Sequence, residues 1–259
     1  MLKIERIKRI KDILKDSNQV EVSTLSNLLN VSDATIRNDL EELEQEGFLT
    51  RFYGGATINV APTEEVTDTA LHPNQVEYNQ DLEELGIIAA RMIRDREWVF
   101  LGPGRTNYYI AKALYSRSNI NILTNNFLVA NLLYHATGIR LLFLGGQVDH
   151  FGCYTLPDDL EHEFDNIYLD KAFFSVDGVD LESGYTLSDR SVLELIQTVS
   201  LYSRETVMVV DRSKFNKRTF RKVGSLDMPL TVVTSPDIPD AYKRYYLEHG
   251  IRTYTAHNL

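Results

Sequence analysis

From Asp81 to the end of the chain, apolar runs of strand length alternate with helical segments. The runs read WVFLG, NILT, RLLFLG, KAFFSV, TVMVV, LTVVT and IRTYT, and the helical segments include DLEELGIIAARMI, TNYYIAKALYS, SVLELIQTVSLYS and PDAYKRYYLEHG. An unbroken apolar run is typical of a strand that is buried on both faces, and strands separated by helices pair in parallel. The sequence therefore predicts an α/β fold for residues 81–259, with a mostly parallel sheet covered by helices on both faces.

Residues 1–60 have a different pattern, which fits three short helices followed by two short strands. The apolar positions expected to face inward are Ile4, Ile7, Ile10, Ile13 and Leu14, then Leu25, Leu28 and Leu29, and then Ile36, Leu40 and Leu43. Ser23 and Ser32 are the expected N-caps of the second and third helices, and Gly47 is expected to end the third. FLTRF and ATINV read as strands joined by a tight turn at Tyr53-Gly54-Gly55. This combination predicts a winged helix-turn-helix.

The segment between the two patterns, residues 61–80, reads APTEEVTDTALHPNQVEYNQ. It is polar, contains two prolines and has no sustained periodicity, which is typical of a linker. We therefore expect three parts: a winged helix-turn-helix in residues 1–60, a linker in 61–80 and an α/β domain in 81–259.

A winged helix-turn-helix reads duplex DNA with the first turns of its third helix, which enters the major groove. Here Ser32 and Thr35 lie at the start of that helix, where hydroxyls and free N–H groups can meet a phosphate. Arg37 can read a guanine edge or clamp a phosphate, and Asn38 can pair with an adenine edge. These four residues are the predicted contacts of the third helix with DNA.

The hairpin, or wing, lies over the adjacent DNA backbone in this arrangement. Arg51 lies at its base and Tyr53 in its turn. Gly54 and Gly55 let the turn approach the duplex closely. We expect Arg51 and Tyr53 to contact DNA as well.

The formal net charge of -10 is unusual for a DNA-binding protein. Even residues 1–60 hold eight Lys and Arg against ten Asp and Glu. Six of those eight cations lie on the first helix, however, and charges are screened beyond about 8 Å in physiological salt. We therefore expect the acidity to suppress non-specific binding rather than to exclude specific binding.

Polar residues collect where the predicted parallel strands end, which is where ligands bind in such folds. These ends read GPGRTN, TNN, GG, DG and DRSKF. In GPGRTN, two glycines, a cation and a hydroxyl precede a helix, a combination suited to an anion. It is neither a Walker loop nor a dinucleotide fingerprint, so the pattern does not indicate nucleotide binding at this loop.

Both halves resemble the DeoR family of bacterial repressors. The stretches that carry the resemblance are VSDATIRNDLEELEQEGFLTRFYGGA, FLGPGRTNYYIAKAL, LTNN, LLFLGGQV, DKAFFSVDGVDLESGYT and VVDRSKF. The resemblance implies an N-terminal winged helix and a C-terminal sugar-phosphate sensor related to ribose-5-phosphate isomerase. It also implies that the phosphate is held by Gly102, Gly104, Arg105, Thr106 and Asn107, and that the sugar is lined by Thr124, Asn125, Asp177, Gly178 and Lys214.

The chain departs from the family pattern at four places. Asn38 stands where the family has the second arginine of a pair, and Gly102-Pro103 stands where it has an acidic residue. Thr155–Pro157 replaces the usual VG, and the lysine expected near Glu194 is missing. These departures leave open which effector binds.

We therefore predict a cytoplasmic transcriptional repressor of carbohydrate-metabolism genes, released from double-stranded operator DNA by a phosphorylated sugar or related metabolite. It is expected to form a homodimer or homotetramer and to need neither a cofactor nor a metal. Cys153 is the single cysteine, and no apolar run approaches the ~18 residues of a membrane span. Two alternatives stay open: an isomerase-like enzyme that uses Asp177, Glu194 and Lys214 for acid–base chemistry, and a constitutive DNA binder with a degenerate sensor.

Overall fold

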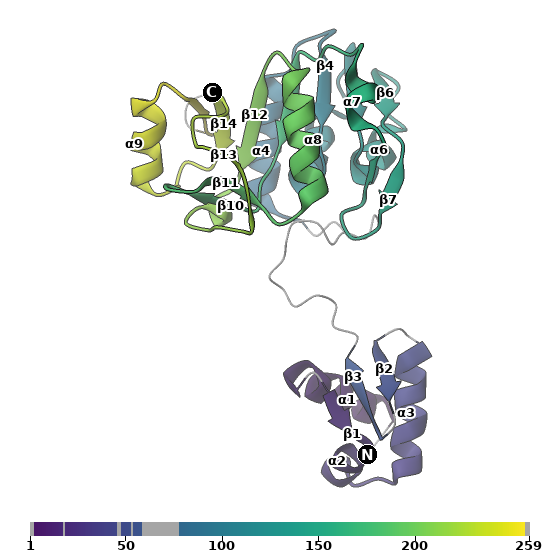
Figure 1. Cartoon of the computed structure of the whole chain (residues 1–259). Coiled ribbons are helices and arrows are strands. Elements are labelled where there is room, and N and C mark those ends of the chain that lie inside the picture. The colour runs from purple at the N-terminus through teal and green to yellow at the C-terminus, as the bar shows by residue number, and fades with distance from the viewer. Residues whose placement is uncertain (1–2, 18, 46–47, 53, 59–77, 257–259) are drawn as a thin grey trace. The chain divides into compact units, whose positions relative to one another are not determined.

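The computed structural model describes residues 3–17, 19–45, 48–52, 54–58 and 78–256. The chain divides into two compact units, Met1–Val66 and Thr67–Leu259, and each is described by itself (Figure 1). Residues 61–77 of the predicted linker, Gly47 and Tyr53 lie outside the described residues. Within the described residues, no helix combines the length and the apolar character needed to cross a membrane.

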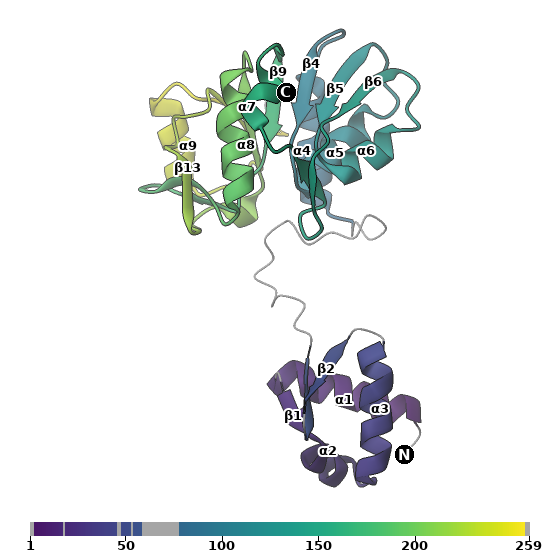
Figure 2. The same ribbon diagram turned by 45° about the vertical axis from the view of Figure 1, so that its right-hand side comes forward.

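The first unit is a winged helix-turn-helix, as predicted (Figure 2). Its elements are α1 (Lys3–Ser17), β1 (Gln19–Glu21), α2 (Val22–Leu29), α3 (Asp33–Gln45), β2 (Leu49–Phe52) and β3 (Gly55–Ile58). The strand β3 lies between β1 and β2 and is antiparallel to both. Gly54 has a φ of +96° in the turn of the β2–β3 hairpin, a backbone conformation that glycine adopts without strain.

The core of this unit follows the predicted helical spacing, but the structure differs from the prediction at Leu28, at the N-cap of α2 and at β1. Buried side chains come from all three helices, among them Ile10, Leu14, Leu25, Leu29, Ile36, Leu40 and Leu43. Leu28 is 61% exposed, so its predicted inward position is wrong. The predicted N-cap Ser23 is also wrong, because α2 begins at Val22 with Glu21 as its N-cap. Sequence periodicity did not predict β1, because only pairing with β3 reveals a strand of three residues.

The second unit contains a seven-stranded sheet in the order β15-β14-β12-β9-β4-β5-β6, and every neighbouring pair is parallel. Its strands are β4 (Trp98–Leu101), β5 (Ile120–Thr124), β6 (Ile139–Phe143), β9 (Lys171–Phe174), β12 (Thr206–Val210), β14 (Thr231–Thr234) and β15 (Arg252–Tyr254). All seven coincide with the predicted apolar runs, which confirms the α/β fold.

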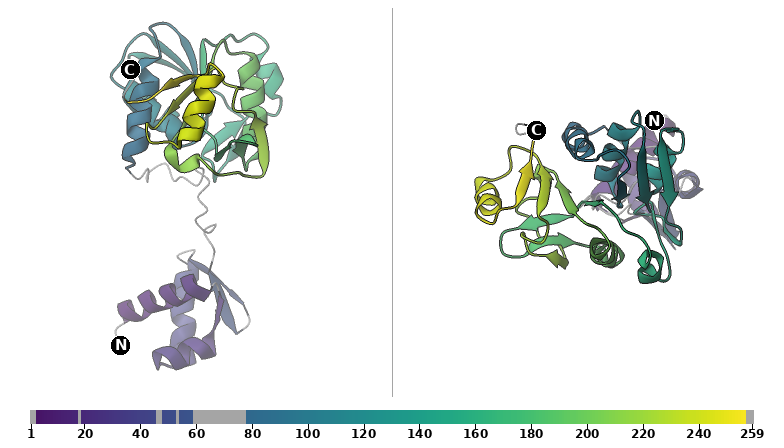
Figure 3. Two further views of the ribbon diagram at one scale, coloured as in Figure 1. Left: turned by 90° about the vertical axis from the view of Figure 1, so that its left-hand side faces the viewer. Right: turned by 90° about the horizontal axis from the view of Figure 1, so that it is seen from above.

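Helices cover both faces of this sheet (Figure 3). One face packs against α4 (Gln80–Arg91), α5 (Arg105–Leu114) and α6 (Phe127–Leu133), and the other against α7 (Leu160–Phe164), α8 (Arg190–Leu201) and α9 (Asp240–Glu248). Alternate side chains of one strand enter opposite clusters: Phe100 of β4 joins the second set of helices, whereas Val99 and Leu101 join the first. This two-sided burial is why the strands read as unbroken apolar runs.

Two small antiparallel sheets flank the large one. β7 (Gln147–Asp149) pairs with β8 (Tyr154–Leu156), and β11 (Gly184–Leu187) pairs with both β10 (Gly178–Asp180) and β13 (Arg221–Gly224). The sequence did not predict these five strands.

The order of the parallel strands reverses between β4 and β9. From β4 the chain builds outward through β5 and β6, and from β9 it builds the other way through β12, β14 and β15. The carboxyl ends of two strands at such a reversal leave a crevice in which α/β proteins bind ligands. Gly102 follows β4 at this point, and its N–H donates to the carbonyl oxygen of Phe173 in β9 (3.2 Å).

Candidate DNA-binding surface and effector site

The start of α3 has the geometry of a capped helix with an exposed outer face. The Ser32 Oγ accepts a hydrogen bond from the N–H of Thr35 (3.2 Å) and lies 2.9 Å from the Thr35 hydroxyl, so Ser32 is the N-cap as predicted. Arg37 and Asn38 are exposed, and neither side chain has a hydrogen-bond or ion-pair partner among the described residues. The structure thus brings four of the predicted DNA contacts together on one exposed helix start.

Arg51, at the base of the wing, is paired with Glu44 of α3. Its Nε lies 2.7 Å from the Glu44 Oε2, and its backbone N–H donates to the Glu44 Oε1 (2.9 Å). These hydrogen bonds lower the pKa of Glu44 below its ordinary value. The pair ties β2 to the end of α3, so a phosphate would have to compete with a carboxylate for Arg51. Its DNA contact stays a prediction, as does that of Tyr53, which lies outside the described residues.

A buried ion pair fixes α3 to α1, and the sequence did not reveal it. The Arg6 guanidinium makes two hydrogen bonds to Asp39, Nε to Oδ2 at 2.5 Å and Nη2 to Oδ1 at 3.1 Å. The two side chains are 11% and 3% exposed, and the hydrogen bond to Asp39 raises the pKa of Arg6. The only signal in the sequence is that Asp39 lies three residues after Ile36, on the inward face of its helix.

At the reversal of strand order, the loop Gly102-Pro103-Gly104 leads from β4 into α5. A Cβ on Gly102 would lie 2.8 Å from the Phe174 ring, and Gly104 has a φ of +95°, so both positions require glycine. Gly104 is the N-cap of α5, and a glycine has no side chain to cap the helix. The first N–H groups of α5 therefore carry their partial positive charge at this loop without a side-chain cap, and the half-buried Arg105 follows.

Buried polar side chains hold this loop in place. The Asn126 Nδ2 donates to the carbonyl oxygens of Gly102 (3.1 Å) and Gly104 (3.0 Å), and the Asn107 Nδ2 donates to that of Pro103 (3.2 Å). The Thr124 hydroxyl donates to the carbonyl oxygen of Leu101 (2.6 Å). The Thr124 side chain is therefore engaged within the protein. Asn126, the last residue of the TNN stretch, positions the loop, and it was not among the predicted site residues.

Four buried polar atoms around this loop have no hydrogen-bond partner among the described residues. They are the Thr106 Oγ1, the Asn107 Oδ1, the Asn125 Oδ1 and the Ser175 Oγ. They follow β4, β5 and β9, the strands on either side of the reversal. Buried polar atoms without partners cost about 1–3 kcal/mol each, so these four atoms make the loop a candidate for completion by a polar ligand or by water.

The rest of the predicted effector set lies after β9 and β12. The Asp177 Oδ2 accepts from the N–H of Ser188 (2.8 Å), and Lys214 is 7% exposed at the end of the 3₁₀ turn η1 (Arg212–Lys214). A Cβ on Gly178 would lie 2.6 Å from the carbonyl oxygen of Lys217, so a close backbone approach explains this glycine. Contact of all three with a sugar stays a prediction.

Comparison with known proteins identifies two domains. The DeoR-like helix-turn-helix domain matches residues 6–61, and the DeoR C terminal sensor domain matches residues 80–236. The HTH-type transcriptional regulator IolR of Bacillus subtilis (strain 168) is 28% identical over 258 residues, which cover 98% of this chain and 100% of that protein. The Glycerol-3-phosphate regulon repressor of Escherichia coli (strain K12) is 26% identical over 252 residues, 97% of this chain and 98% of the other.

Among solved structures, the ribose 5 phosphate isomerase A from Neisseria gonorrhoeae is similar over 53% of this chain and 54% of its own, with a TM-score of 0.39 and 16% identity.

The named relatives are transcriptional regulators rather than enzymes. Glu194 is one of the three residues named for the isomerase alternative. Its side chain is exposed on α8 and forms an ion pair with Arg190 (2.7 Å), which does not favour an acid–base role for it. No group of three or more histidines, cysteines and acidic residues that could hold a metal occurs in the described part of the chain. The two domain matches, together with the winged helix and the parallel sheet, show that this chain belongs to the DeoR family of transcriptional regulators.

Proposed function

We propose that the chain represses genes of carbohydrate metabolism by binding operator DNA through α3, and that a phosphorylated sugar or related metabolite releases it. In this proposal the effector binds at the carboxyl ends of β4, β5 and β9. The concentration of four buried polar atoms without partners at these strand ends carries the proposal. Two relatives point to the same class of genes by their names, a Glycerol-3-phosphate regulon repressor and a putative aga operon transcriptional repressor.

The chemistry of those atoms favours a ligand with both hydroxyls and a phosphate. The amide oxygens of Asn107 and Asn125 only accept hydrogen bonds, so each needs a donor such as a sugar hydroxyl. The hydroxyls of Thr106 and Ser175 can donate to a phosphate oxygen. The amino end of α5 and the Arg105 guanidinium add the positive pole that a phosphate requires.

The DNA half of the proposal is tested by Arg37→Ala. If Arg37 makes a bidentate contact to a base, its loss costs ~1–3 kcal/mol, or about 5- to 150-fold in affinity. Because Arg37 is exposed and has no partner within the described residues, folding should be unchanged. Fluorescence anisotropy with a duplex selected from a random pool measures the affinity. A matched variant, Arg190→Ala on α8, should bind as the parent does, and parental affinity of Arg37→Ala would remove Arg37 from the interface.

The proposed assembly is a homodimer or homotetramer. One recognition helix reads only a few base pairs, so useful specificity requires at least two copies on repeated half-sites. We expect light scattering at micromolar concentration to give a mass of at least twice the 29.7 kDa of one chain. A monomeric mass both with and without the selected duplex would contradict the proposed assembly.

A further inference from the structure

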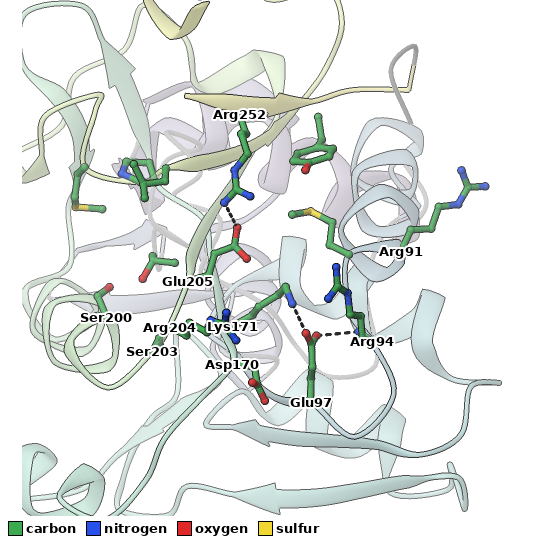
Figure 4. Close-up of a pocket in the computed structure, with 16 residues that line it drawn as sticks. Arg91, Arg94, Glu97, Asp170, Lys171, Ser200, Ser203, Arg204, Glu205 and Arg252 are labelled. Atoms are coloured by element: carbon green, nitrogen blue, oxygen red, sulfur yellow. Dashed lines mark hydrogen bonds and ion pairs between the residues drawn. The ribbon is translucent and has the colours of Figure 1, made fainter. Parts of the chain in front are cut away.

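A cavity of about 760 Å³ lies at the edge of the parallel sheet opposite the proposed effector site (Figure 4). Its lining comes from the amino ends of β4, β9, β12 and β15, from the segment before β14 and from the carboxyl ends of α4 and α8. A strand of four residues spans about 13 Å, which separates this cavity from the loop after β4. The volume lies within the range of about 300–1,000 Å³ that small-molecule sites occupy.

The charge of this cavity opposes that of the whole chain. Its lining holds five cations, Arg91, Arg94, Lys171, Arg204 and Arg252, and three acids, Glu97, Asp170 and Glu205. The formal net charge of the whole protein is -10. The carboxyl ends of α4 and α8 add about half a negative charge each, which is less than the excess of two cations. The cavity is therefore cationic in an acidic protein.

The three acids are already engaged by neighbours. The Glu97 carboxylate accepts from the Lys171 Nζ (2.5 Å) and from the backbone N–H of Arg94 (2.9 Å), as Figure 4 shows. The Glu205 Oε1 accepts from the Arg252 Nη2 (2.7 Å) and from the Thr231 hydroxyl (2.7 Å).

The third acid, Asp170, accepts from the backbone N–H of Trp98 (2.8 Å). The guanidinium groups of Arg94 and Arg204, by contrast, have no ion-pair partner among the described residues. Two guanidinium groups without counter-ions in one cavity are suited to bind a phosphate.

The same cavity has an apolar wall. Leu230 is 68% exposed and Met228 37% exposed, and both line the cavity together with Tyr254. The Ser200 Oγ is buried in the lining and has no hydrogen-bond partner among the described residues. We propose that this cavity binds an organic phosphate with an apolar or aromatic portion, a nucleoside phosphate being the matching class. The phosphate lies against Arg94 and Arg204, and the base lies against Met228, Leu230 and Tyr254.

The test is calorimetric titration of the full chain with ADP, with adenosine and inorganic pyrophosphate as comparisons. ADP should bind more tightly than adenosine or pyrophosphate, because only ADP contacts both the two arginines and the apolar wall. The double variant Arg94→Ala/Arg204→Ala should bind ADP at least tenfold more weakly, since the loss of one hydrogen bond to a charged group already lowers the affinity by about tenfold. Arg244→Ala, an exposed arginine of α9 outside the cavity, is the matched control and should bind as the parent does.

Three results would overturn the proposal: no binding of ADP, equal affinity of the parent and the double variant for ADP, or equal affinity of the parent for pyrophosphate and ADP. If the second of these results came with loss of ADP binding in Arg105→Ala, it would assign ADP to the opposite edge of the sheet. The proposed effector response does not enter this test, so the two proposals fail separately.

Discussion

The Asp39→Ala variant is expected to lose about 3 kcal/mol of stability in the winged helix, because it leaves the Arg6 charge buried without its partner. A domain of this size has a total stability of only ~0.05–0.15 kcal/mol per residue, so the loss is a large part of it. Because Asp39 joins α3 to α1, the amino end of α3 should lose its fixed position. Affinity for DNA should fall with the folded fraction.

Two measurements on the full chain separate the effect on the winged helix from any effect on the sensor domain. Amide hydrogen exchange in α1 and α3 should become faster by more than about a hundredfold, the equivalent of about 3 kcal/mol. Trp98 is the only tryptophan and lies in β4, so its fluorescence reports the unfolding of the second unit alone and should be unchanged.

Two further variants control for the loss of side-chain contacts. Arg6→Met/Asp39→Leu should recover most of the stability, because replacing a buried pair by apolar side chains is often neutral. Glu42→Ala breaks the exposed pair with Lys3 and should have little effect. Parental exchange rates in Asp39→Ala would show that the buried pair does not stabilise the domain.

The Arg105→Ala variant is expected to lose the response to the effector while keeping its affinity for DNA in the absence of effector. Arg105 begins α5, directly after the loop that Asn126 holds, so we expect its guanidinium to contact the phosphate of the effector. An effector loosens DNA binding only by preferring the conformation that binds DNA poorly, and typical coupling is ~1–3 kcal/mol, or about 5- to 150-fold. An effector whose phosphate no longer binds cannot supply this coupling free energy.

The measurement is the affinity for a selected duplex with and without the effector, in Arg105→Ala and in the matched surface variant Arg190→Ala. The surface variant should respond as the parent does, since Arg190 pairs only with Glu194 on the outside of α8. A parental response in Arg105→Ala would remove Arg105 from the effector site.

The sequence predicted the strands of the large sheet because each is an apolar run buried on both faces. The five strands of the small sheets have three or four residues each and exist through pairing with distant segments. The pairing of Tyr185 with Gly224, for example, joins residues far apart in the chain, and no local pattern encodes it. Periodicity was least reliable in α2, where eight residues leave too few turns to separate the exposed Leu28 from the buried Leu25 and Leu29.

The candidate site was predictable in its location but not in its detail. The structure brings the polar residues that follow the parallel strands to one edge of the sheet, as predicted, because the carboxyl ends of such strands lie together. Which of two adjacent asparagines holds the loop depends on side-chain direction: Asn126 donates to Gly102 and Gly104, whereas Asn125 donates to Thr155. The buried pair of Arg6 and Asp39 joins positions 33 residues apart, and only the folded chain brings them into contact.

In the proposed function, a phosphorylated sugar binds the second unit and weakens the binding of the first unit to DNA. The most direct measurement is the affinity of the full chain for a selected duplex across a broad panel of sugar phosphates, with melting temperature followed in parallel. The proposal predicts that at least one member weakens DNA binding by about 5- to 150-fold and raises the melting temperature of the second unit. If no member of the panel changes either quantity, the claim is contradicted, and the chain is a DNA binder that acts without an effector of this class.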